Sequence, residues 1–134
     1  MIKIAIGLVL LAHGIGHSMG ILQVLKVATV NPAWRGDSWV LTGVAGTTVT
    51  QVVGVAIWAA AIVGFTALAA VVFGWLPPSW WQPLAIGSSL ISLAGLLLFP
   101  MAFPTFSTIG AVLVDAAVLA AVLVFHWGPA DLPA

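Results

Sequence analysis

Two histidines lie one helical turn apart inside an apolar segment of the chain, residues 4–27. His13 and His17 are four positions apart, so on a helix their side chains share one face. Asp115 lies midway along the last apolar segment. Ionisable side chains are costly in the hydrocarbon of a membrane, and those that occur there usually serve a function. Because a carboxylate that orients an imidazole is a recurrent acid–base arrangement, we expect His13, His17 and Asp115 to be catalytic residues.

The same side chains could instead join two helices and do no chemistry. A polar contact between helices in a membrane contributes about 1 kcal/mol to their association. The high cost of a carboxyl group at mid-membrane favours a functional role for Asp115. Neutral histidine is cheaper to bury, so for His13 and His17 the two interpretations stay open.

The pattern of ligand-type residues is incomplete for a metal site. Two histidines at i and i+4 are half of a zinc or iron site, and Asp115 could be a third ligand. A second carboxylate or a further histidine at the same depth is missing, because His126 falls near the end of the last apolar segment. Histidines on one helix face cannot ligate the two opposite faces of a single haem. We therefore assign no metal ligands and no cofactor, and the sequence leaves open whether the histidine pair binds a metal or shares a haem across a homodimer.

Composition points to lipid as the solvent of this chain. The 134 residues are 63% hydrophobic and 4% charged, with a mean hydropathy of +1.26. No charged residue occurs between Ser38 and Val114. In lipid every backbone polar group needs an internal partner, and long apolar runs without alternation favour helices over a barrel.

The net charge is zero and no basic cluster exists, so nucleic acid is not an expected partner. The absence of cysteine excludes thiol chemistry.

Four spanning helices are predicted in a single domain, 1–134. A span needs roughly 20 apolar residues, and proline and glycine mark the breaks between spans. The segment Thr42–Thr50 is rich in glycine and threonine and is predicted to be an interfacial or tilted turn. The predicted helices cover residues 4–27, 51–73, 81–99 and 105–127. The fold class is thus an all-α, integral membrane four-helix bundle.

An even number of spans places both termini on the same side of the membrane. Tryptophan is enriched at membrane interfaces, and four tryptophans fall at one predicted interface while two fall at the other. The lysines and arginine are too few to orient the protein across the membrane. The two groups are Trp75, Trp80, Trp81 and Trp127, and Trp34 and Trp39.

The candidate catalytic residues His13 and Asp115 are expected at the same depth in the membrane. At 1.5 Å per residue, His13 lies about 15 Å from the interface where the first helix begins. Asp115 lies about 18 Å from the interface where the fourth helix ends, which is the same interface. We therefore expect these side chains to meet near the centre of the bilayer, with His126 at the surface.

Residues that share faces with this polar cluster are candidates to bind a ligand. Small residues at a spacing of four let helix backbones approach closely in lipid, so packing is the alternative role. The serines of the third helix are expected to bond back to carbonyl groups of their own helix. The candidate ligand-binding residues are Gly16, Gly20, Thr108, Trp58 and Ser92.

The segment Leu11–Gly20 resembles a broad set of small, four-span bacterial membrane proteins with an HGxxH-type first helix. The layout is similar to the DoxX-like group, whose members carry a His-Gly pair in helix one. Some members are linked to quinone-dependent or redox membrane complexes, and they carry an acidic residue in helix two where this chain has Gln51. The resemblance implies a multi-pass protein of the bacterial inner membrane.

Three function classes follow. The favoured one is an intramembrane acid–base enzyme or a binding protein for a lipophilic small molecule, such as a quinone, isoprenoid or epoxide. The second is a proton-linked transporter or channel for a small ion or solute. The third is an accessory subunit of a larger membrane complex, in which the polar groups only fix helix packing. The glycine-rich helix faces would also suit a homo-oligomer.

Overall fold

The computed structural model describes residues 1–131, and regular structure in this range is helical. Four helical stretches are long and apolar enough to cross a membrane, which confirms the predicted fold class. The elements are α1 (Ile2–Gly16), α2 (Ser18–Val24), α3 (Leu41–Val72), η1 (Pro78–Trp80), α4 (Trp81–Leu98), α5 (Thr105–Leu123) and η2 (Pro129–Asp131).

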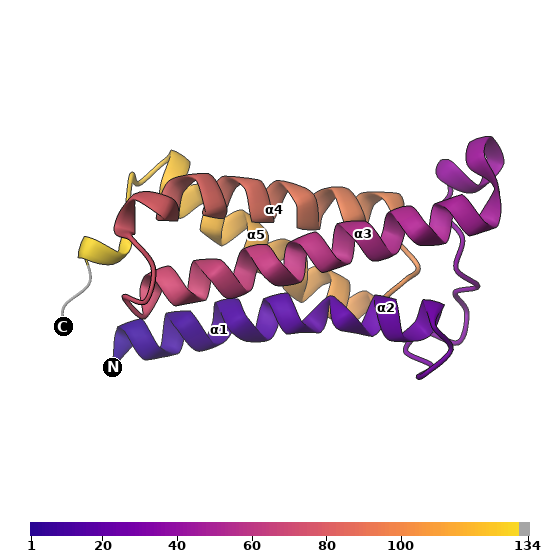
Figure 1. Cartoon of the computed structure of the whole chain (residues 1–134), viewed down its shortest axis with the longest axis horizontal. Helices are drawn as coiled ribbons and strands as arrows, with labels where there is room; N and C mark the ends of the chain where they lie inside the picture. The colour runs from indigo at the N-terminus through magenta and orange to yellow at the C-terminus, as the bar shows by residue number, and fades with distance from the viewer. Residues whose placement is uncertain (132–134) are drawn as a thin grey trace.

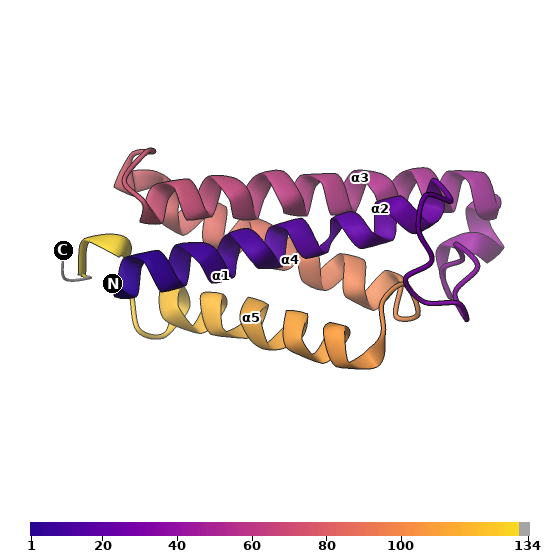
Figure 2. The same cartoon turned by 90° about the horizontal axis from the view of Figure 1, so that it is seen from below.

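The helices run alternately up and down as one bundle. The start of α1 and the short helix η2 lie at the same end, as expected for four spans (Figure 1). Trp81, at the start of α4, donates its indole N–H to the carbonyl oxygen of Trp127 over 2.8 Å, which ties α4 to the segment after α5 at this end. Seen from below, α3 and α5 lie on opposite sides, with α1, α2 and α4 between them (Figure 2).

The four sides of this bundle are not packed equally. The first span packs closely on α3, α3 on α4, and α4 on α5. The remaining side, between α1 and α5, is held by far less contact. This loosely packed seam is where the first and last helices of the chain meet.

The first predicted span is two helices rather than one. His17 lies between α1 and α2, and its backbone N–H donates to the carbonyl of Gly14 over 3.1 Å in a tighter turn. The span then ends at Val24, three residues before the predicted end at Val27. Lys26 has a φ of 58°, a left-handed conformation that stops the helix.

The second span begins earlier than the predicted residue 51. Its first turn, from Leu41, is separated from the rest at Gly46, whose φ of 78° and ψ of 167° are not helical. The expected irregular turn in Thr42–Thr50 is thus concentrated at one glycine. In the fourth span, α5 ends at Leu123 rather than at Trp127, and His126 has a φ of 51°.

The apolar core is divided into two clusters. One lies toward the end that holds the N-terminus and is built on Phe65, Leu68 and Trp81. The other is aromatic and is built on Trp34, Trp58 and neighbouring phenylalanines. A small group of buried polar side chains lies between them.

Candidate functional site

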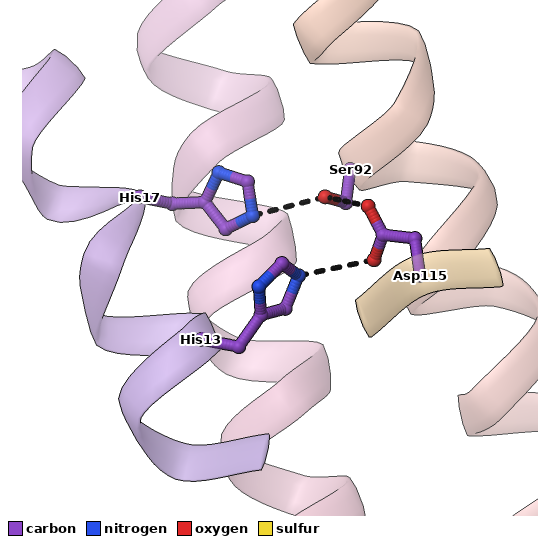
Figure 3. Close-up of polar contacts among 4 residues, drawn as sticks. All are labelled: His13, His17, Ser92 and Asp115. Carbon is purple, nitrogen blue, oxygen red and sulfur yellow. Dashed lines mark hydrogen bonds and ion pairs between the residues drawn. The ribbon is translucent and has the colours of Figure 1, made fainter. Parts of the chain in front are cut away.

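The buried polar group joins three helices through one carboxylate. Nε2 of His13 lies 3.0 Å from Oδ1 of Asp115, and the two side chains are 6% and 0% exposed (Figure 3). The hydroxyl of Ser92 donates to the other carboxylate oxygen, Oδ2, over 2.6 Å. Nε2 of His17 lies 3.0 Å from the same hydroxyl oxygen. We call His13, His17, Ser92 and Asp115 the polar quartet.

The local structure of the first span sets the two histidines in place. A Cβ on Gly14 would lie 2.8 Å from Cβ of Phe65, so glycine lets α1 approach α3 closely. The ring of His13 stands edge-on to that of Phe65, with centroids 4.4 Å apart. The ring of His17 faces Phe103 in the same manner at 6.1 Å. Each imidazole thus hydrogen-bonds within the quartet and packs against one of the two apolar clusters.

A cleft of about 580 Å³ lies against the histidines, between the first span and α5. Its wall is mainly apolar, and several of its residues, such as Gly16 and Gly110, are exposed on the outside of the bundle. The cleft therefore opens sideways, where hydrocarbon tails surround a membrane protein. It is lined by Val9, Ala12, His13, Gly16, His17, Met19, Val30, Leu96, Phe103, Pro104, Ser107, Gly110, Ala111 and Val114.

A second groove of about 360 Å³ continues along the same seam. Val9 and Val114 line both spaces, so the cleft and the groove adjoin. The groove is almost wholly apolar and reaches Trp81 and Trp127 at the end of the bundle that holds the N-terminus. The cleft and the groove thus line the seam between α1 and α5 with mainly apolar side chains, from the imidazoles to Trp81 and Trp127.

The candidate ligand-binding residues do not all lie at one site in the structure. Gly16 lines the cleft, whereas a Cβ on Gly20 would lie 2.9 Å from the indole of Trp58. Trp58 is 1% exposed within the aromatic cluster, and its N–H has no hydrogen-bond partner among residues 1–131. The hydroxyl of Thr108 donates to the carbonyl of Pro104 over 3.3 Å and stays outside the cleft. Ser92 belongs to the quartet.

Ser92 departs from the expected behaviour of membrane serines. Its hydroxyl bonds two side chains of other helices instead of a carbonyl group of α4. The sequence offers one signal for this role, because Ser92 follows Ser88 by four positions and the two therefore share one face of a helix. Both serines are buried in α4. Sequence reasoning did not find Phe103, which walls the cleft and contacts His17, because it lies in the turn before α5.

The quartet is a hydrogen-bonded cluster. Within residues 1–131, no three His, Cys, Asp or Glu side chains converge as they would around a metal ion. His17 reaches Asp115 only through Ser92, and His126 is exposed at the far end of α5. What the arrangement can do is hold a proton between an imidazole and a buried carboxylate beside an apolar cleft.

Comparison with protein-family models, with curated proteins and with solved structures finds no match to this chain. The resemblance of Leu11–Gly20 to the DoxX-like group therefore stays a prediction.

Proposed function

We propose that this chain binds a lipophilic small molecule in the cleft between the first span and α5, with His13 and Asp115 as its acid–base pair. The observation that carries the proposal is the lining of this cleft. Its wall is mainly apolar, yet two imidazoles line it, each hydrogen-bonded into a network around one buried carboxylate. Sites for small lipophilic molecules combine an apolar wall with few, well-oriented polar groups in this manner.

The position of the cleft supports a ligand that arrives through the membrane. The cleft opens on the side of the bundle, and the adjoining groove is apolar along its length. A water-soluble substrate would have to cross hydrocarbon to reach the imidazoles. A quinone, an isoprenoid or a similar molecule is already dissolved there.

The burial of the quartet supports acid–base chemistry. Asp115 is fully buried and is hydrogen-bonded to side chains of two other helices, so the His13 ring is held in one orientation. A general base works when it is positioned within hydrogen-bond reach of its substrate and its own partner fixes it. His13 would exchange a proton with the polar group of the ligand, and Asp115 would stabilise the ring in its charged form.

On the resemblance of the first helix to the DoxX-like group, we also propose that the protein lies in the bacterial inner membrane.

Native mass spectrometry of the protein released from mild detergent tests the proposal. We expect a discrete bound mass on the wild type that is lost in Asp115→Asn. The matched control is Asp37→Asn, because Asp37 is exposed in a loop, and this variant should keep the bound mass. Bare, folded chains in all three samples would set the proposal aside and direct attention to transport assays and to partners.

A further inference from the structure

We infer that a phospholipid of net negative charge binds at the end of the bundle where α2 ends, with its phosphate group held by Lys26 and Arg35. This end lies opposite the one that holds the N-terminus (Figure 1). A pocket of about 300 Å³ lies there, between the segment that follows α2 and Gln51 of α3, and both basic residues line it. The site is separate from the cleft, so the inference does not rest on the proposed function.

The charge of this pocket is positive. Lys26 and Arg35 are two of the three Lys and Arg residues of the chain, and no Asp or Glu lines the pocket. The one ion pair found within residues 1–131 joins His13 to Asp115, so no carboxylate of this range neutralises the two basic side chains. An anionic group can therefore bind in the pocket without displacing a carboxylate of the protein.

The chain between the two basic residues is fixed by the side chain of Gln23. Its Nε2 donates to the carbonyl oxygens of Asn31 and Trp34 over 2.6 and 3.0 Å. Its Oε1 accepts from the backbone N–H groups of Val30 and Asn31 over 2.9 and 2.8 Å. These four hydrogen bonds hold the segment against α2, so the long side chains of Lys26 and Arg35 start from fixed positions on one pocket.

A further polar group comes from α3. A Cβ on Gly36, whose φ is 84°, would overlap Nε2 of Gln51, so glycine at this position leaves room for the amide. Gln51 lines the pocket together with the two basic residues. An amide N–H₂ group is a hydrogen-bond donor, and phosphate oxygens are acceptors. The pocket thus combines positive charge with a neutral donor.

Lys26 adopts a backbone conformation that favours glycine. Its φ is 58°, and the N–H groups of Val27 and Ala28 both return to the carbonyl of Leu22, over 2.9 and 3.3 Å. Glycine is the usual residue in this left-handed position after a helix. Backbone strain of this kind is concentrated at functional sites, which supports a role for the lysine side chain.

The position along the bundle favours a lipid as the source of the phosphate. The first span ends at Val24 and the second begins at Leu41, so the pocket lies where the headgroups of a membrane are expected. Trp39, which is 70% exposed, belongs to the same loop, and tryptophan is enriched at this level. Basic pockets at the ends of membrane helices bind anionic headgroups. A zwitterionic headgroup would bring its own ammonium group toward two positive charges, so a net negative charge is expected.

Matched phospholipids test the site. We would add dioleoyl phosphatidylglycerol or dioleoyl phosphatidylcholine to the full chain in mild detergent and measure bound lipid by native mass spectrometry. The wild type should bind phosphatidylglycerol at least about tenfold more tightly, because two basic residues face its net charge. Lys26→Gly and Arg35→Gln should each weaken phosphatidylglycerol about fivefold and leave phosphatidylcholine unchanged. The matched control is Lys3→Gln, which removes one positive charge outside this pocket and should change neither lipid.

The choice of glycine at residue 26 separates binding from folding. Glycine adopts the left-handed conformation without strain, so Lys26→Gly should be at least as stable as the wild type in thermal unfolding. A loss of phosphatidylglycerol in this variant is then a loss of the site and not of the fold. Arg35 is exposed, so Arg35→Gln should also unfold at the temperature of the wild type.

Three results would overturn the inference. Equal binding of the two lipids by the wild type, or an equal loss in Lys3→Gln, would show a general attraction to charge without a site. If soluble glycerol phosphate displaces phosphatidylglycerol at equal concentration, the ligand is a free phosphate and not a lipid. If the preference is lost in Asp115→Asn and kept in Lys26→Gly, the lipid binds in the cleft. None of the first two results changes the mass expected in the cleft, so the proposed function is tested separately.

Discussion

Nε2 of His13 lies 3.0 Å from Oδ1 of Asp115, which joins the first and last spans across 102 positions of sequence. The seam between these spans is otherwise the least packed side of the bundle. The contact therefore closes the bundle at the level of the quartet, while the cleft and the groove remain open along the same seam. We expect this carboxylate both to stabilise the fold and to orient the site, and the two roles can be separated by experiment.

Replacing Asp115 with asparagine should weaken the bundle. Asparagine presents one acceptor oxygen and an amide N–H₂ group in place of two carboxylate oxygens, so His13 or Ser92 must change from donor to acceptor and the hydrogen bonds to a charged carboxylate are lost. Buried hydrogen bonds between membrane helices contribute modestly, and we expect the free energy of unfolding to fall by about 1–2 kcal/mol. Unfolding in a denaturing detergent, followed by circular dichroism, measures this loss.

The same substitution at Asp37 is the control for that measurement. Asp37 is exposed, so Asp37→Asn should stay within about 0.5 kcal/mol of the wild type. Equal stability of all three proteins would mean that the contact between His13 and Asp115 adds nothing to the fold.

The proximity of His13 and Asp115 can be predicted from the sequence, whereas other parts of the site cannot. Helical rise and an even number of spans were enough to place His13 and Asp115 at one depth. The break at His17 depends on a local choice between two helical hydrogen-bond patterns, which apolar periodicity does not report. The role of Ser92 depends on how α4 is rotated about its axis. The cleft exists because α1 and α5 pack loosely against each other, and the sequence alone does not report how closely two helices pack.

Gly20 should tolerate no larger side chain. A Cβ there would meet the indole of Trp58 at 2.9 Å, and that ring is held by the aromatic cluster. Overpacking of this kind costs about 1–3 kcal/mol, which exceeds the gain in helix propensity of about 1 kcal/mol. We expect Gly20→Ala to lower the thermal midpoint in detergent. Gly87→Ala is the control, since its Cβ meets nothing within 4 Å, and it should be neutral or stabilising.

Gly46 should be required for its backbone conformation and not for space. Its φ of 78° and ψ of 167° lie in a region that is almost confined to glycine, although a Cβ would meet nothing within 4 Å. Gly46→Ala should therefore cost about 1–3 kcal/mol from strain alone. Gly43→Ala, in the helical turn just before it and equally free of contacts, should be neutral in the same unfolding measurement. A stabilised Gly46→Ala variant would show that the break in α3 is not held by the fold.

Filling the cleft should separate ligand binding from stability. Gly16 lines the cleft and a Cβ there meets nothing within 4 Å, so Gly16→Leu can place its side chain in the empty space without moving the helices. We expect the unfolding free energy to stay within about 1 kcal/mol of the wild type or to rise, because glycine is a poor residue inside a helix. The bound mass seen by native mass spectrometry should be lost. Gly87→Leu, on α4 and outside the cleft, should keep it. A Gly16→Leu protein that folds and still carries the ligand would place the binding site elsewhere on the bundle.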